Sequence, residues 1–225
     1  SQRIPATLLL MGAGLGLAVL IGIPLGVVAA RKANGVLDRL ISMLCLFGYA
    51  MPAFWMGLLL LMTFTQFYHL FPAGGMTTIG SPFSIQDVLW HLALPVMCLV
   101  LYSLAGITLF VRSSLLQVLR QDYITTARGK GLKERAVFYR HALRNSLLPV
   151  TTNIGVSLAY LLSGAVVVEA VFSWPGLGLL TFDAVLQRDY PVLLALFLVF
   201  SLMVIAVNLV MDIVYGLLDP RITYG

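Results

Sequence analysis

The sequence predicts an all-α protein that crosses a membrane several times. Of its 225 residues, 60% are apolar and 10% are charged, whereas a soluble domain has roughly 45–50% and 25%. Its apolar residues form runs long enough for a bilayer core, which takes about 20 residues of helix to cross. Its basic residues gather between these runs, mostly on one side. These three observations exclude a water-soluble fold.

Five membrane spans are expected, at about residues 5–30, 40–68, 88–111, 147–170 and 190–216. Each lies largely within a stretch that is free of Asp, Glu, Lys and Arg. The charge-free run from Leu40 to Gln86 is too long for one span, and glycine and proline residues between 72 and 82 indicate a loop in its second half. Residues 1–225 therefore form a single transmembrane domain, a bundle of five spanning helices.

The basic residues indicate which side of the membrane each loop occupies. Twelve of the fourteen Lys and Arg residues fall on one side, and only Arg3 and Arg188 fall on the other. Because basic residues accumulate on the cytoplasmic side, we expect the loop 112–146 and the C-terminus in the cytoplasm and the chain in a cell (inner) membrane. Five spans then place Ser1 outside. We therefore expect that a first helix upstream is missing.

The loop 112–146 has a helical pattern as well as charge. Apolar residues recur at steps of three and four and predict a helix from Ser114 to Arg128. Gly129 and Gly131 should end that helix, since a glycine costs about 1 kcal/mol in a helix interior. A second helix is expected from Lys133 into the next span. This knob at the membrane surface suits docking into a groove on a partner, and the net charge of +5 reflects such loops rather than nucleic-acid binding.

The stretch from Asp122 to Leu132, followed by Arg140 to Asn145, resembles the coupling loop of permease subunits in the dipeptide, oligopeptide and nickel family of ABC importers. The wider consensus of importer permeases is matched only at Ala127, Gly131 and Leu143, so the resemblance is to the peptide-family form of the loop. The resemblance implies that the ATPase-coupling residues are Asp122, Tyr123, Thr126, Ala127, Arg128, Gly129, Lys130, Gly131 and Leu132.

Further motifs extend the resemblance over essentially the whole chain from Arg3 onward. They are Pro52-x-Phe54-Trp55, the run 169–178, the run 188–191 and the run 218–221. The family's own first helix has no counterpart here. The run 169–178 belongs to a loop expected outside the membrane, with Glu169, Trp174, Pro175, Gly176 and Gly178. Two interpretations are open for this loop: contact with a binding protein or substrate, or an aromatic anchor at the membrane interface followed by a turn.

The resemblance implies a type I ABC importer permease, which moves dipeptides or oligopeptides across the inner membrane by alternating access. Nickel or another small solute is the alternative cargo. The implied partners are a second permease subunit, two cytoplasmic ATPase subunits, an external substrate-binding protein and membrane lipid. The chain has no Gly-x4-Gly-Lys-Ser/Thr loop, so we expect ATP to be used by the partner subunits and the chain itself to be neither an enzyme nor a cofactor-binding protein.

Two other classes of protein fit the hydropathy alone. A channel or secondary carrier is one, although proton-coupled carriers usually keep ionisable groups at membrane depth, and no charge lies at the centre of an expected span. An intramembrane protease is the other. It would need a nucleophile–base pair or a zinc site within the spans, and the sequence shows no such catalytic or metal-binding group.

Overall fold

The computed structural model describes residues 3–218, apart from the side chains of eight residues within α7 and α9. The motif at 218–221 and the expected cytoplasmic C-terminus therefore lie largely outside the described residues. The helices, in order, are α1 (Arg3–Arg31), α2 (Val36–Ala50), α3 (Ala53–Leu60), η1 (Leu61–Phe67), α4 (Ile85–Leu119), α5 (Asp122–Gly129), α6 (Glu134–Ala136), η2 (Val137–Leu143), α7 (Arg144–Val171), α8 (Leu177–Gln187) and α9 (Tyr190–Leu218). The two η segments are π-helical, with wider turns than an α-helix.

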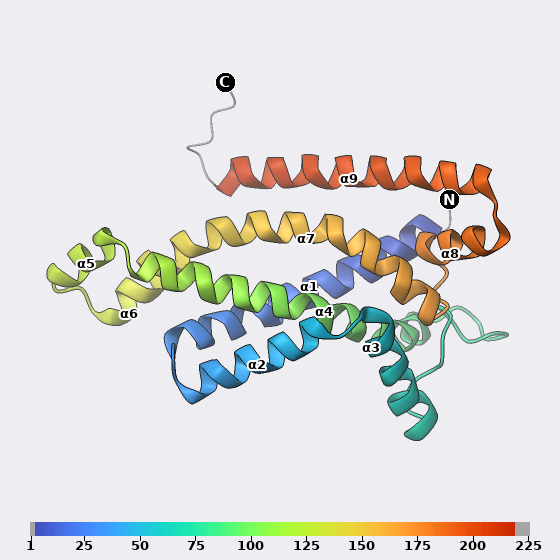
Figure 1. The fold of residues 1–225 in the computed structure, drawn as a ribbon, viewed down its shortest axis with the longest axis horizontal. Helices are drawn as coiled ribbons and strands as arrows, with labels where there is room; N and C mark the ends of the chain where they lie inside the picture. The colour runs from blue at the N-terminus through green and yellow to red at the C-terminus, as the bar shows by residue number, and fades with distance from the viewer. Residues whose placement is uncertain (1–2, 219–225) are drawn as a thin grey trace.

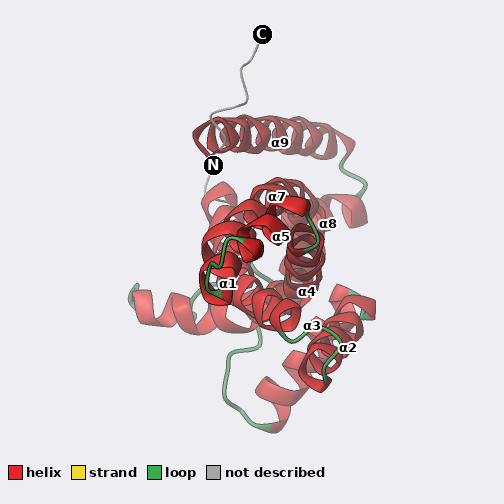
Figure 2. Cartoon of the chain, turned by 90° about the vertical axis from the view of Figure 1, so that its left-hand side faces the viewer, coloured by secondary structure: helices red, strands yellow, loops and turns green. Residues whose placement is uncertain are grey.

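The long helices α1, α4 and α7 run side by side along the longest axis of the molecule (Figure 1). α9 lies against α7 and α8, on the side opposite to α2, which packs on α4 and α1. Viewed along the long axis, α9 is set apart from the central group (Figure 2). Three helices among the described residues are long and apolar enough to cross a membrane: α1, α4 and residues 190–213 of α9.

Successive long helices run in opposite directions, which separates two ends of the bundle (Figure 1). The α1–α2 turn and the connection from α4 to α7 lie at one end, called here the basic end because residues 31–39 and 112–144 carry eleven Lys and Arg side chains. The loop 68–84, α8 and the first turn of α1 lie at the other end, called here the α8 end. Arg3 and Arg188 belong to the α8 end, as the charge pattern predicts.

The expected span 40–68 is not one straight helix. It is divided into α2 and the pair α3–η1, which meet at an angle of 100°. The cause lies at Met51 and Pro52: a proline disfavours helical backbone in the residue before it, and Met51 is extended with φ −80° and ψ 129°. If the bent pair counts as one span, the described residues contain up to four candidate spans.

Glycine residues bring α1 close to α4. A Cβ atom at Gly22 would lie 2.9 Å from the Ile107 side chain, and a Cβ at Gly26 would lie 2.7 Å from the Thr108 carbonyl oxygen. Small residues at this spacing allow membrane helices to pack backbone against backbone. Gly12 and Gly16 have the same spacing, but a Cβ at either would meet nothing within 4 Å.

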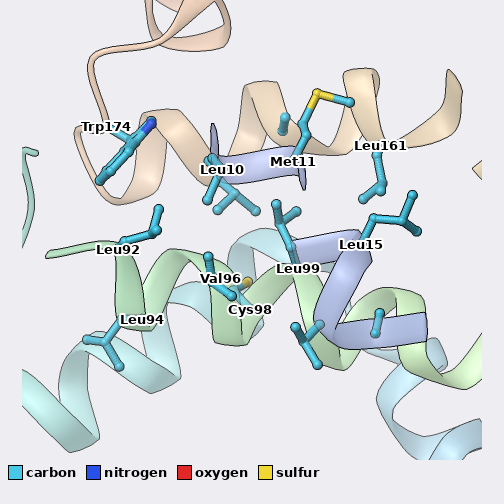
Figure 3. Packing of buried hydrophobic residues seen from close by; sticks show 14 of the residues in the cluster. Leu10, Met11, Leu15, Leu92, Leu94, Val96, Cys98, Leu99, Leu161 and Trp174 are labelled. Atoms are coloured by element: carbon cyan, nitrogen blue, oxygen red, sulfur yellow. The ribbon is translucent and has the colours of Figure 1, made fainter. Parts of the chain in front are cut away.

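The main apolar core lies where α1, α4 and α7 meet (Figure 3). Leu10 and Leu15 of α1 and Leu99 of α4 are buried there together with Leu161 of α7. Trp174, in the connection from α7 to α8, closes the core at the α8 end. One face of α1 is therefore buried against helices from distant parts of the sequence, while its other face is exposed.

The glycine contacts generate a prediction with an internal control. Gly26→Ala is expected to destabilise the protein by about 1–3 kcal/mol, the usual cost of overpacking a core, because the added methyl group meets backbone. Gly12→Ala is the matched control, since the space around Gly12 is open and alanine favours a helix over glycine by about 0.8–1.0 kcal/mol. The measurement is the thermal unfolding midpoint of each purified variant in mild detergent. Equal midpoints for the two variants would contradict the packing described.

Candidate functional site

The connection between α4 and α7, residues 120–143, is called here the coupling segment. The expected single helix from Ser114 to Arg128 is wrong: α4 ends at Leu119, and α5 begins at Asp122 after Gln121, whose backbone is extended with φ −75° and ψ 148°. The break redirects the chain so that Ile124 and Ala127 face the rest of the protein and are buried. A straight continuation of α4 would have carried them away from the bundle.

The expected glycine turn is confirmed. α5 ends at Gly129, and Gly131 has φ +79°, a left-handed conformation that L side chains rarely adopt. The Gly131 N–H donates to the Arg128 carbonyl at 2.9 Å and so closes the turn. The return helix then runs without interruption from Glu134 through η2 into α7.

A small second core fixes the coupling segment to the bundle. Ile124 and Ala127 of α5 pack with Val137, Phe138 and Ala142 of the return helix. Ala30 at the end of α1 and Leu115 near the end of α4 complete this cluster. α5 is therefore joined to the ends of α1 and α4 by close-packed side chains.

An ion pair spans the glycine turn. Arg128 donates from Nε to Glu134 Oε2 at 3.1 Å and from Nη2 to Oε1 at 2.7 Å. The hydrogen bond from Arg128 holds the pKa of the Glu134 carboxyl below its ordinary value, so the pair is present above that ordinary value and is lost as the pH falls through the lowered pKa. Both side chains are largely exposed, so the pair adds little to stability.

Eight of the nine residues expected to couple to an ATPase are exposed on the coupling segment. Ala127 is the exception, because it is 8% exposed and faces the small core. Tyr123 and Leu132 are large apolar side chains that are 43% and 44% exposed. Isolated exposed apolar side chains are common on protein surfaces, so the exposure of these two makes them accessible to a partner without showing one.

At the α8 end, Glu169 joins three parts of the chain. Its carboxylate is fully buried and accepts a hydrogen bond from the Thr7 hydroxyl at 2.7 Å. It also accepts the backbone N–H groups of Gly178 at 2.7 Å and Leu179 at 3.2 Å, in the first turn of α8. The N-terminal N–H groups of a helix have no hydrogen-bond partner within the helix. This carboxylate provides an acceptor for two such groups of α8 and so attaches α8 to α7 and α1.

Trp174 and two glycines complete the junction between α7 and α8. Trp174 is fully buried, and its indole N–H donates to the Ala6 carbonyl of α1 at 2.9 Å. A Cβ at Gly176 would overlap the Glu169 carboxylate, and a Cβ at Gly178 would overlap the backbone of Val166. Glycine is required at both positions because the connection passes so close to α7.

This burial bears on both interpretations of the external loop. An aromatic anchor at the membrane interface is wrong for Trp174, because its side chain is enclosed by α1, α7 and α8 rather than exposed. Glu169 and Gly178 are likewise enclosed, and Gly176 is buried, while Pro175 is partly exposed. In this structure these residues hold α8 in place, and contact of this loop with a binding protein or substrate stays a prediction. Sequence reasoning missed Thr7, which has no motif around it.

The arrangement defines a class: a polytopic helical membrane protein with a short helical segment protruding at one end. Among solved structures, a chain of the inward-facing MetNI methionine ABC transporter matches with a TM-score of 0.76 and 15% identity, covering 97% of this chain and 95% of that one. A chain of an amino acid ABC transporter determined with histidines matches with a TM-score of 0.70 and 14% identity, covering 98% and 92%. At these identities the likeness concerns the fold.

Sequence comparison defines the family. The chain belongs to the binding-protein-dependent transport system inner membrane components, whose family model matches residues 22–224. It is 45% identical over 222 residues to the oligopeptide transport system permease protein AppB of Bacillus subtilis, with 99% of this chain and 70% of that protein covered. It is 40% identical to the dipeptide transport system permease protein DppB of Escherichia coli K12, with 99% and 72% covered. The chain is thus a multi-pass permease component of the inner membrane.

The junction at the α8 end generates the second prediction. Glu169→Ala leaves the Thr7 hydroxyl and two N–H groups of α8 without an acceptor, and each buried unsatisfied group costs about 1–3 kcal/mol. We expect α8 to lose its fixed position, seen as faster hydrogen exchange of residues 174–187, while the coupling segment keeps its protection. Glu169→Gln retains one acceptor oxygen and should show a smaller change. Exchange in Glu169→Ala that is unchanged from the parent protein would contradict the proposed attachment.

Proposed function

We propose that this chain imports dipeptides or oligopeptides as one of two permease subunits, driven by two cytoplasmic ATPases and supplied by an external binding protein. The single observation that carries the proposal is the identity of 40–45% over 99% of the chain to permeases named for oligopeptide and dipeptide transport. The family description, which specifies dependence on a binding protein, supports the external partner. The path for the peptide lies between the two permeases and opens alternately to each side.

The orientation follows from the two ends of the bundle. We place the basic end in the cytoplasm and the α8 end outside, with five spans formed by α1, α2 with α3 and η1, α4, α7 and α9. The concentration of eleven basic residues at one end supports this orientation. It exposes the coupling segment to the compartment that contains ATP, and it exposes α8 to the compartment from which a binding protein delivers cargo.

Cysteine labelling tests the orientation. Single cysteines at Lys130 and Thr77, which are exposed at opposite ends, should react differently with a membrane-impermeant maleimide applied to intact cells. We expect position 77 to be labelled and position 130 to be protected until the membrane is permeabilised. The native Cys45 and Cys98 are buried, at 7% and 1% exposure, so the parent protein should give a low background. Labelling of position 130 in intact cells would reverse the assignment.

The coupling role is tested on the exposed face of the segment. Leu132→Asp is expected to reduce the amount of ATPase that co-purifies and to reduce uptake by about tenfold or more, since burying one unpaired charge at an interface typically costs at least 1.4 kcal/mol. Membrane abundance should stay normal, because Leu132 is 44% exposed and takes no part in the small core. Leu132→Met, which conserves volume and apolarity, is the matched control.

Normal ATPase association and uptake in Leu132→Asp would leave the segment as a topology anchor without a coupling role. Ala127 is unsuitable for this test, because a charge there would enter the small core and damage the segment itself.

Reconstitution tests the cargo. The chain, its partner permease, the two ATPases and the binding protein are placed in proteoliposomes, and ATP-dependent accumulation of labelled dipeptide, labelled oligopeptide and nickel is compared. We expect accumulation of at least one peptide that requires both ATP and the binding protein. Accumulation of nickel without accumulation of either peptide would contradict the peptide assignment and favour the metal.

A further inference from the structure

The attachment of α2 to the bundle depends on very few side chains. All fifteen residues of α2 are described, and only Asp38 and Cys45 among them are buried. Much of the remaining surface of α2 is apolar and exposed: Met43 is 68% exposed, and Leu44 and Phe47 are each 64% exposed. Because α2 buries so little apolar surface, packing alone restrains its position only weakly. Asp38 is therefore the main buried side chain that attaches the first turn of α2 to the bundle.

Asp38 is held by a two-pronged ion pair with α4. Its side chain is 3% exposed, and its two carboxylate oxygens accept Arg112 Nε at 2.5 Å and Arg112 Nη2 at 2.7 Å. The Asn34 N–H donates to the same carboxylate at 2.8 Å, and the Ser42 hydroxyl donates at 3.5 Å. A planar guanidinium that binds a carboxylate through two parallel hydrogen bonds fixes orientation as well as distance. The pair thus determines both the position and the direction of α2 relative to α4.

The same stretch of α4 is part of the attachment of the coupling segment. Arg112 lies one helical turn before Leu115, which is fully buried in the small core with Ile124 and Val137. A movement of the coupling segment therefore reaches Arg112 through one turn of helix and reaches α2 through Asp38. Without the ion pair, α2 keeps the buried Cys45 and the partly exposed stack of Tyr49 on Tyr102 of α4, at 6.2 Å between ring centroids, as its contacts with α4.

The pair formed by α2 and α3 is also attached at the α8 end of the bundle, through α3. After the bend at Met51 and Pro52, α3 packs closely on the end of α7: a Cβ atom at Gly57 would lie 3.0 Å from the Val171 side chain and 3.2 Å from the Phe172 side chain. Phe172 is fully buried beside Trp174, in the junction that Glu169 holds together. α2 and α3 are thus attached near both ends of the bundle, α2 by its ion pair with α4 and α3 by its packing on α7, with a bend between the two attachments.

We propose that Asp38 is a positioning residue for transport: its pair with Arg112 makes α2 move with α4 and the coupling segment, and the bend at Pro52 passes that movement to α3 at the α8 end. This inference rests on the proposed function, because it assumes that the coupling segment is moved by ATPases. Asp38 touches no cargo in this role. It acts through the helix that it orients.

The experiment compares uptake and ATP hydrolysis in the same proteoliposomes. Asp38→Asn removes the ion pair but leaves Arg112, which is 26% exposed, within reach of water. We expect the variant to keep ATP hydrolysis and to lose about tenfold in cargo accumulated per ATP, within the range of about 5- to 150-fold typical of coupling between two sites. Arg39→Gln is the matched control, since Arg39 is exposed in the same turn of α2 and its loss removes one charge without removing the pair.

A second variant separates positioning from folding. Asp38→Asn combined with Arg112→Gln leaves no uncompensated charge, so membrane abundance should be normal even if either single variant is poorly folded. Uptake per ATP should still be low in the double variant, because two amides do not reproduce the charged two-pronged pair. Normal uptake per ATP in either variant would overturn the proposal, and so would a loss of uptake that only parallels a loss of abundance. Failure of the proposed function would give a different result: the parent chain itself would show no ATP-dependent uptake.

Discussion

The close approach of α1 to α4 is the contact on which the rest of this structure depends. Gly14, Gly22 and Gly26 leave one stripe of α1 without side chains. Leu99, Ile107 and Thr108 of α4 occupy the space along this stripe. In lipid the gain from excluding water is absent between helices, so close packing has to supply the association. The packed helices α1 and α4 extend from the α8 end to the basic end, and further segments of the chain are attached to them at both ends.

At each end, a segment from the second half of the chain is attached to α1. At the basic end, Ala30 of α1 packs under the coupling segment. At the α8 end, the Thr7 hydroxyl donates to Glu169 and accepts the Leu177 N–H in the first turn of α8, and the Ala6 carbonyl accepts the Trp174 indole N–H. One helix therefore connects the surface proposed to receive ATPase motion with the surface proposed to face a binding protein.

Local patterns were sufficient to predict much of this arrangement. Hydropathy predicted the long helices, the charge pattern predicted the common end of residues 31–39 and 112–144, and Gly131 predicted the turn in the coupling segment. The direction in which Ala127 points, the burial of Glu169 and the pairing of Asp38 with Arg112 were not predicted. Each depends on a contact between residues distant in sequence, 74 positions apart for the ion pair and 162 for Thr7 with Glu169, and no local pattern encodes such contacts.

The small core shared by α5, Ala30 of α1 and Leu115 of α4 leads to the central claim, that the coupling segment, α1 and α4 move as one rigid body. Spin labels at Thr125, exposed on α5, and Leu17, 42% exposed on α1, allow their separation to be measured by pulsed electron paramagnetic resonance in the assembled transporter. The nucleotide-free state is compared with an ATP-bound state in which hydrolysis is blocked. The account predicts the same distance distribution in both states. A shifted or split distribution would show that the segment moves independently of α1 and would contradict the claim.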